Sequence, residues 1–171
     1  PNMSLGLWSL AAAPHAERNP AILAWDPDFN LGIGEARFSP NGKWIGFVAV
    51  NLRVAHAATI EVMPSTGAMR SQWTTLTPPN DWADKPRWSP DGKAIYFTRY
   101  RNSYWNVWGL RFDDTTGRPI GEPFQVTRFD SARHQIDDFV QGVELGVAAR
   151  RLVLNLSEQT GSIWMVANLN R

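Results

Sequence analysis

The chain has 171 residues, with nine Trp, twelve Pro, thirteen Gly and no Cys. Lys and Arg number 17 against 16 for Asp and Glu, and the two signs are interspersed, so the basic patch of a nucleic-acid or anionic-membrane partner is missing. The absence of Cys excludes disulfides and thiol chemistry, and no apolar run reaches the roughly 18 residues of a membrane helix, so no membrane insertion is expected.

The first predicted element is a short strand at residues 7–10. Its Leu7-Trp8-Ser9-Leu10 lies 100 positions before Val107-Trp108-Gly109-Leu110, and Ile60 falls in register between Leu10 and Leu110. An internal repeat of this kind decides the fold class. Residues 1–30 therefore read as half of a repeating unit, its last two strands.

The end of this half unit contains alternating oxygen-bearing side chains. Asp26, Asp28 and Asn30 have the spacing of a calcium loop. The expected Gly is displaced to Gly32, however, and Arg37 stands where the bidentate Glu belongs. An ordinary turn is favoured, these three residues remain weak calcium candidates, and no cofactor is expected.

The next two units, residues 31–79 and 80–129, match each other without a gap at an offset of 50. Residues 37–47 and 87–97 share the pattern Arg-aromatic-Ser-Pro-Asn/Asp-Gly-Lys. The Ser-Pro-Asx-Gly segment predicts a hairpin turn, in which Pro presets φ and Gly92 adopts a positive φ. Second strands follow at 44–50 and 94–100, with Ile and Phe two apart facing the core. Third strands, Thr-Gly turns and fourth strands complete each unit.

The last unit, residues 130–171, is a degenerate copy. Leu145 takes the place of Phe38 and Trp88, and Ile163 to Val166 repeat the Trp-centred third strand. Val147 to Arg150 replace the Ser-Pro-Asx-Gly turn, so the turn geometry of this unit is left open.

Four-stranded antiparallel units that repeat about every 50 residues are typical of β-propeller blades. The predicted fold is all-β: one β-propeller region over residues 1–171, with blades that form an incomplete ring. Such a chain is part of a longer ring or pairs with another copy, and its open blade edges predict self-association.

The segment Arg87 to Phe97 resembles the repeat of TolB-like propellers, also called WD-like propeller repeats, and residues 37–47 give a second match. The same blade occurs in periplasmic TolB-type binding proteins, in bacterial signalling propellers and in the propeller domains of prolyl oligopeptidase-like enzymes. This resemblance alone favours a periplasmic or extracytoplasmic location. The matched residues belong to turns and core, so no family binding residue transfers.

Catalytic motifs are missing from the sequence. It has no Gly-x-Ser-x-Gly elbow, its three His are scattered, and the adjacent Asp pairs 113–114 and 137–138 point to opposite faces if they lie in strands. The chain is therefore expected not to be an enzyme by itself.

Strand parity sorts the loops of an up-and-down blade to two ends. The Ser-Pro-Asx-Gly and Thr-Gly turns share one end, and longer, polar and aromatic loops share the other, at residues 28–30, 53–56, 80–85, 101–105 and 130–134. Four Trp at repeat-equivalent strand positions are assigned to packing between blades: Trp8, Trp88, Trp108 and Trp164. Trp82 and Trp105 are placed in exposed connections. The ligand-binding candidates at this loop end are Trp82, Asp84, Tyr104, Trp105, Arg133 and His134.

Three functions follow from this sequence. The first is a noncatalytic scaffold that binds a peptide or protein segment through the loop end. The second is the accessory propeller of a prolyl oligopeptidase-like hydrolase whose catalytic domain lies outside this chain. The third is a purely structural array of blades.

Overall fold

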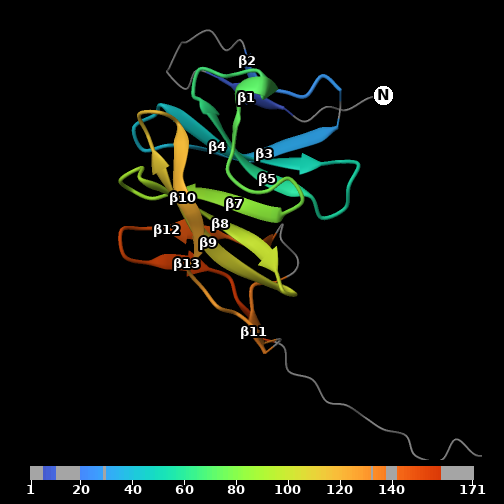
Figure 1. The fold of residues 1–171 in the computed structure, drawn as a ribbon, viewed down its shortest axis with the longest axis vertical. Coiled ribbons are helices and arrows are strands. Elements are labelled where there is room, and N and C mark those ends of the chain that lie inside the picture. The colour runs from blue at the N-terminus through green and yellow to red at the C-terminus, as the bar shows by residue number, and fades with distance from the viewer. Residues whose placement is uncertain (1–5, 11–19, 29, 132, 138–141, 159–171) are drawn as a thin grey trace, which may run out of the picture.

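The computed structural model describes residues 6–10, 20–28, 30–131, 133–137 and 142–158. Strands dominate these ranges, as predicted, and the helical segment among them is the 3-10 turn η1 (Arg70–Gln72). No helix within these ranges has the length and apolarity to span a bilayer. The layers of strands follow one another along the longest axis of the molecule, from β1 and β2 at one end to β11 at the other (Figure 1).

Two complete four-stranded meanders form the centre of the molecule. Blade one contains β3 (Leu31–Phe38), β4 (Trp44–Asn51), β5 (Ala58–Pro64) and β6 (Thr74–Thr75). Blade two contains β7 (Trp82–Trp88), β8 (Ala94–Arg101), β9 (Tyr104–Asp113) and β10 (Arg118–Gln125). Each strand pairs antiparallel with the next, and a single parallel bridge from Ala58 to Trp82 joins the blades.

Incomplete blades flank this pair. A half blade precedes it, made of β1 (Leu7–Ser9) and β2 (Ala21–Ala24), and a partial blade follows it, made of β11 (His134–Gln135), β12 (Leu145–Val147), β13 (Leu152–Leu154) and β14 (Ser157–Glu158). In the partial blade β12 pairs with β13 and β11 pairs with β14. β11 and β12 are therefore two segments of its first strand, and β13 and β14 are two segments of its second strand. The Trp-centred segment 163–166 lies outside the described residues.

The Ser-Pro-Asx-Gly turns have identical hydrogen-bond networks. In blade two, Gly92 N donates to Ser89 O (2.9 Å), Ala94 N donates to Ser89 Oγ (2.9 Å), and Lys93 N donates to Asp91 Oδ1 (3.1 Å). Residues 39–44 repeat every one of these bonds. Gly92 has φ +72°, so the predicted positive φ is confirmed. Asp91 and Ser89 thus supply the acceptors that hold a left-handed Gly in the turn.

The third strands do not follow the offset of 50 that the sequence predicted. Gly46 pairs with Val62, and its counterpart Tyr96 pairs with Gly109, so β5 and β9 are offset by 47 rather than 50. The reason is loop length. Asn51 N donates to Ala57 O, which leaves residues 52–56 as the loop between β4 and β5, whereas Asn102 and Ser103 alone connect β8 to β9. Both of these residues have positive φ, as in a two-residue hairpin. The alignment of Ile60 with Leu110 is therefore wrong.

The turn of the partial blade also differs from the prediction. Ala148 N donates to Arg151 O (2.9 Å), which closes a shorter turn than that of residues 89–94. The pair next to the turn is Val147 with Leu152. Val147, and not Leu145, therefore occupies the place of Trp88.

Each blade junction encloses a separate core. The half blade and blade one bury Ile45 and Phe47, blades one and two bury Ile95 and Phe97, and blade two and the partial blade bury Trp105 and Leu145. The predicted core residues of the second strands are confirmed, since all four are at most 2% exposed. Stability therefore depends on contacts between neighbouring blades.

The Trp residues assigned to packing divide between core and surface. Trp88 and Trp108 pack against the core between blades one and two, as expected. Trp8 is 58% exposed, contrary to the prediction. It lies on the outer face of the half blade, which has no neighbouring blade among the described residues.

Candidate functional site

The structure sorts the loops to two ends as strand parity predicted. At the turn end, Asn41 Nδ2 of blade one donates to Asp114 Oδ2 beside the Thr-Gly turn of blade two (2.8 Å). At the loop end, Ala58 N donates to Asp81 O (2.8 Å), and the His56 ring stacks on Trp82 at 4.2 Å. The candidate residues can therefore be examined against one another at the loop end.

Trp82 is the centre of an aromatic cluster at this end. It is the first residue of β7 and is partly buried. Its ring lies 5.4 Å from that of Tyr100 and 4.7 Å from that of Trp105, in addition to the stack with His56. The neighbouring His and Trp rings cover much of the Trp82 indole, so packing uses most of its surface.

Trp105 lies in β9 and is 1% exposed, so its assignment to an exposed connection is wrong. The two-residue loop at Asn102 and Ser103 starts β9 early and draws Trp105 into the core between blade two and the partial blade. A side chain with this burial offers no surface to a partner.

Asp84 also lies within a strand and not in a loop. It precedes a β-bulge in β7, and its Oδ1 accepts a hydrogen bond from Lys85 N (2.7 Å). Burial raises the pKa of Asp84, although the Lys85 N–H and ammonium act in the opposite direction. The carboxylate lies inside an ionic network between blades, away from the loop end.

That network joins the bulges of consecutive first strands. Glu35 and Lys85 are equivalent bulge residues, both with positive φ, and Lys85 Nζ lies 2.8 Å from Glu35 Oε1. Arg87 adds a 3.4 Å contact to Glu35 Oε2 and a 3.7 Å contact to Glu144 of the partial blade. Bulges often redirect side chains at sites of function or assembly, and here they direct charges across the blade junctions.

Tyr104 lines an open groove of about 400 Å³ at the loop end of blade two. We call it the Tyr104 groove. Its lining combines aromatic rings, guanidinium groups and amides, from Arg101, Asn102, Tyr104, Asn106, Trp108, Gln125, Arg128, Phe129 and Asp130. This composition is typical of a surface that binds a peptide or protein.

Asn106 fixes the far wall of the Tyr104 groove. Its Oδ1 accepts hydrogen bonds from Phe129 N (2.7 Å) and Thr127 Oγ1 (3.0 Å), and its Nδ2 donates to Phe129 O (3.1 Å). One buried amide therefore holds both backbone groups of Phe129, so the wall is held in place before any ligand arrives.

Asp81 positions two arginines beside the groove. It forms an ion pair with Arg99 and a 3.7 Å contact with Arg101 Nη2. The guanidinium carbons of Arg99 and Arg101 lie 5.2 Å and 6.0 Å from the centre of the Trp108 ring. Burial lowers the pKa of Arg99, and the Asp81 carboxylate partly offsets this effect. The arrangement presents a cation over an indole, which suits the planar and acidic groups of a peptide.

Arg133 and His134 lie apart from this groove, on the partial blade. Both side chains are exposed and approach Glu158 Oε1, each at 3.6 Å. The structure therefore groups Tyr104 with Arg101 and Trp108, groups Trp82 with Trp105, and leaves Arg133 and His134 as a separate pair.

Sequence reasoning missed the roles of Trp108, Arg128 and Phe129 in this groove. Trp108 was assigned to packing alone. A usable signal was present, because Tyr104, Asn106 and Trp108 are two apart and must share one face of a strand. The contribution of Arg128 and Phe129 depends on the Asn106 bonds, which no local pattern predicts.

Two of the three weak calcium candidates, Asp26 and Asn30, use their side-chain oxygens for hydrogen bonds. Asp26 Oδ2 accepts from Asn30 N (2.7 Å) and Leu31 N (3.0 Å), and its Oδ1 contacts Arg70 Nη1 (3.4 Å). Asn30 Oδ1 accepts from Arg53 Nε. N–H donors therefore surround these oxygens and tie down the turn, and no cluster of three metal-ligating side chains occurs among the described residues.

Neither a family model nor a curated protein matches the chain. Among solved structures, it is similar to a puromycin-hydrolyzing peptidase of Mycobacterium tuberculosis, with 16% identity and a TM-score of 0.51 over 65% of this chain and 19% of the peptidase. A putative TolB from Agrobacterium tumefaciens shows 17% identity and a TM-score of 0.32 over 88% of this chain and 69% of the other. The chain thus spans about a fifth of the peptidase, and at this identity the likeness to it is one of fold, a β-propeller.

Proposed function

We propose that this chain is a noncatalytic propeller scaffold that binds a peptide or protein segment at the loop end of blade two. The observation that supports this function best is the Tyr104 groove. Tyr104, Trp108 and Arg101 line it together, and the guanidinium of Arg101 lies over the Trp108 ring. Aromatic and Arg side chains are the usual anchors of protein interfaces.

The proposal gains support from the rigidity of the groove. Asn106 holds Phe129 by both backbone groups, and Asp81 holds Arg101 near Trp108. A groove with walls fixed in this way loses little conformational entropy on binding, and affinity rises accordingly.

The test starts from a displayed library of random linear peptides, selected on the immobilised chain. A selected peptide is labelled, and its dissociation constant is measured by fluorescence anisotropy. We expect Tyr104→Ala and Arg101→Ala each to weaken binding by roughly 1 to 3 kcal/mol. Asn106→Ala should also weaken it, because Phe129 is released from the groove wall.

Matched controls come from the turn end. Asn41→Ala and Thr116→Ala remove exposed polar side chains and should leave the dissociation constant unchanged. Binding that is insensitive to Tyr104 and Arg101 but lost in the turn-end variants would refute the assignment of the loop end.

A second candidate is the accessory propeller of a hydrolase. The likeness in fold to the puromycin-hydrolyzing peptidase favours it. Under this hypothesis, the loop end would face a catalytic domain encoded elsewhere in the same reading frame. A Gly-x-Ser-x-Gly motif downstream in that frame would support it, and a frame without a hydrolase domain would exclude it.

A further inference from the structure

A second pocket, of about 310 Å³, lies at the junction of the two complete blades. Leu76 and Pro78 line it from blade one, and residues of β8, β9 and β10 line it from blade two. We call it the Pro123 pocket. Its lining residues all fall within the continuous described range 30–131, so the pocket belongs to the part of the chain that is described without a gap.

A bulge in β10 opens the Pro123 pocket. The pairing of β10 with β9 is interrupted between Ile120 and Phe124, so residues 121–123 all stand opposite Leu110. Gly121 has φ +71°, a conformation that favours glycine and permits the bulge. Three residues opposite one cannot keep the regular pairing, and the space that they leave lies beside Leu110.

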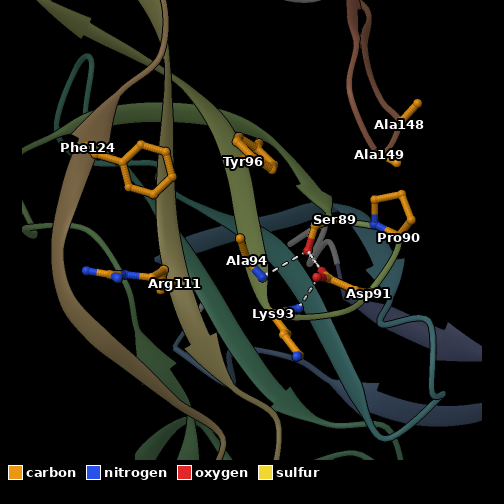
Figure 2. A pocket seen from close by; sticks show the side chains of 10 residues that line it. All are labelled: Ser89, Pro90, Asp91, Lys93, Ala94, Tyr96, Arg111, Phe124, Ala148 and Ala149. Carbon is orange, nitrogen blue, oxygen red and sulfur yellow. Dashed lines mark hydrogen bonds between the residues drawn. The ribbon is translucent and has the colours of Figure 1, made fainter.

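The same bulge directs Phe124 to the other face of blade two. Phe124 points toward Tyr96 (Figure 2), and the two rings meet edge to face at 6.3 Å. Both rings line the groove of about 650 Å³ on that face (Figure 2). Pro119 and Pro123 remain on the face toward blade one, where they line the Pro123 pocket.

The preceding junction has a larger side chain at this position. Pro123 corresponds to Trp73 of blade one, because the residue after each of them pairs with the same position of the third strand. The Trp73 ring meets that of Phe47 edge to face at 4.9 Å, and its Nε1 donates to Ala68 O (3.1 Å). Trp73 therefore packs against the core between the half blade and blade one. Pro is much smaller than Trp, so the corresponding space beside blade two is not filled by Pro123.

Two buried donors at the Pro123 pocket lack an acceptor. Arg99 is 3% exposed, and its Nε has no hydrogen-bond partner among the described residues. The same holds for Trp108 Nε1. Both groups can only donate, and a buried donor without an acceptor costs free energy. A ligand that brings an acceptor would remove this cost.

The charges around the pocket favour an anionic acceptor. Asp81 forms an ion pair with Arg99 and lies 3.7 Å from Arg101 Nη2, so one carboxylate is shared by two guanidinium groups. Glu122 also lines the pocket, but it is exposed on the bulge, where water and salt screen its charge. The inner part of the pocket therefore carries net positive charge.

The geometry and the walls of the pocket narrow the choice of anion. The guanidinium carbon of Arg99 lies 5.2 Å from the centre of the Trp108 ring, so one carboxylate can accept from both side chains. A carboxylate also matches the planar fork of Arg. The remaining walls are apolar, and they come from Leu76, Pro78, Leu110, Pro119 and Pro123. These walls suit a short carbon chain beside the carboxylate.

We propose that the Pro123 pocket binds a carboxylate that carries a short apolar chain. The carboxylate accepts hydrogen bonds from Arg99 and Trp108 Nε1, and the chain lies against the leucines and prolines of the walls. The ligand is a free acid or an acidic group of a peptide held in the Tyr104 groove, because Arg101 and Trp108 line both sites. Only the peptide source rests on the proposed function.

The first test titrates the full chain with pentanoate and follows the indole N–H signals by NMR. Trp108→Phe identifies the Trp108 signal. We expect this signal to move downfield and to saturate, because its N–H gains a charged acceptor. Pentanamide, which has the same chain without the charge, should bind about tenfold more weakly. Inorganic phosphate, which has charge without the chain, should also bind about tenfold more weakly.

Two variants test the pocket from different directions. Pro123→Trp introduces the residue of the preceding junction and keeps both arginines, so pentanoate binding should be lost. Arg99→Lys keeps a cation beside Asp81 but loses the planar fork, and it should weaken binding about tenfold. Ile120→Trp is the matched control, since Ile120 lies on the same strand outside the pocket lining, and it should bind pentanoate as the wild type does.

A third measurement distinguishes the two sources of the carboxylate. A peptide selected on the chain is compared as a free acid and as a C-terminal amide, and its Asp and Glu are replaced in turn by Asn and Gln. A peptide carboxylate that adds affinity in the wild type but not in Pro123→Trp identifies the peptide as the source. If pentanoate binds and no peptide carboxylate adds affinity, the ligand is a free acid. Peptides that do not bind at all would refute the proposed function and leave the pentanoate result standing.

Three results would overturn the proposal. The first is equal affinity for pentanoate and either pentanamide or phosphate. The second is a Trp108 N–H signal that does not saturate with pentanoate or with any peptide carboxylate. The third is undiminished pentanoate binding by Pro123→Trp, because the ligand would then bind elsewhere.

Discussion

Two glycines at the turn end, Gly92 and Gly117, differ in what a substitution would cost the folded state. At both the backbone would be strained, but only at one would the new side chain also be overpacked. Gly92 and Gly117 have φ +72° and +71°, in the region where a Cβ is unfavourable. A Cβ on Gly92 would meet Pro40 at 3.6 Å, an ordinary contact, whereas one on Gly117 would lie 2.1 Å from Trp44. The Trp44 ring is held in place because its Nε1 donates to Asp114 O (2.8 Å).

We therefore expect Gly92→Ala to lower the free energy of unfolding by about 1 kcal/mol. Gly117→Ala should lower it by about 3 kcal/mol, since the strain of overpacking adds to the backbone cost. Urea denaturation of both variants measures the difference. Equal effects of the two substitutions would show that Gly117 does not pack against Trp44.

Glu61 predicts a pH dependence that opposes the usual one for acids. The residue is 6% exposed, and its Oε2 has no hydrogen-bond partner in the described structure. Burial raises its pKa above 4.5, although hydrogen bonds from Thr59 and Thr75 act in the opposite direction. The folded state therefore holds this proton more tightly than the unfolded state, and stability falls as the pH rises from 4.5 through the raised pKa.

Glu61→Gln removes this ionisation. We expect the variant and the wild type to have similar unfolding free energies below pH 4.5, and the variant to be more stable above the raised pKa. Chemical denaturation across this pH range measures the difference. If the unfolding free energy of the variant fell below that of the wild type at high pH, the Glu61 carboxylate would instead be stabilised in its ionised form.

The turn residues were predictable from the sequence because their conformation is local. Ser, Pro, Asx and Gly each fix one feature of the turn, so residues 39–42 and 89–92 identify the hairpin without tertiary information. Trp105 was not predictable in this way. Its burial depends on a loop three residues shorter than in blade one, and the local sequence resembles an exposed connection.

At the scale of the strand, the bulges in β3 and β7 connect neighbouring blades. The hydrogen bond and charge of Lys85, together with Arg87, hold the pKa of Glu35 below 4.5 despite burial, which by itself would raise it. Lys85 is 4% exposed, so its ammonium depends on Glu35 and on the more distant Asp84.

Glu35→Gln should therefore lower the free energy of unfolding by about 2 kcal/mol, because a buried cation loses its main partner. Lys85→Met should cost less, since Arg87 still contacts Glu35. The loss from Glu35→Gln should be complete above pH 4.5 and should diminish as the pH falls through the lowered pKa of Glu35. A loss independent of pH would contradict the ionic role.

The sequence did not predict this network. Glu35 and Lys85 differ in charge and are separated by 50 positions, and neither stands in a recognised motif. Only the repeat register, combined with a bulge that rotates both side chains toward the junction, brings them together.

At the scale of the whole molecule, the repeat offset of 50 was sufficient to predict the all-β fold, the strand order and which loops lie at each end of a blade. It failed in the third strands, where loop length shifts the register to 47. Interactions between blades were harder to predict from the sequence, because a core that forms between repeats depends on which surface each blade presents to its neighbour.

The central claim is that two blades repeat one strand register. Amide hydrogen exchange, measured for each residue, is its most direct test. β4 and β8 are paired on both sides and should exchange slowest, with matching protection at residues 45–50 and 95–100. Protection in the third strands should match at an offset of 47, with fast exchange at residues 54–56, because Leu52 N and Arg53 N are hydrogen-bonded. Third strands that match at 50, or protection without a repeat, would contradict the account.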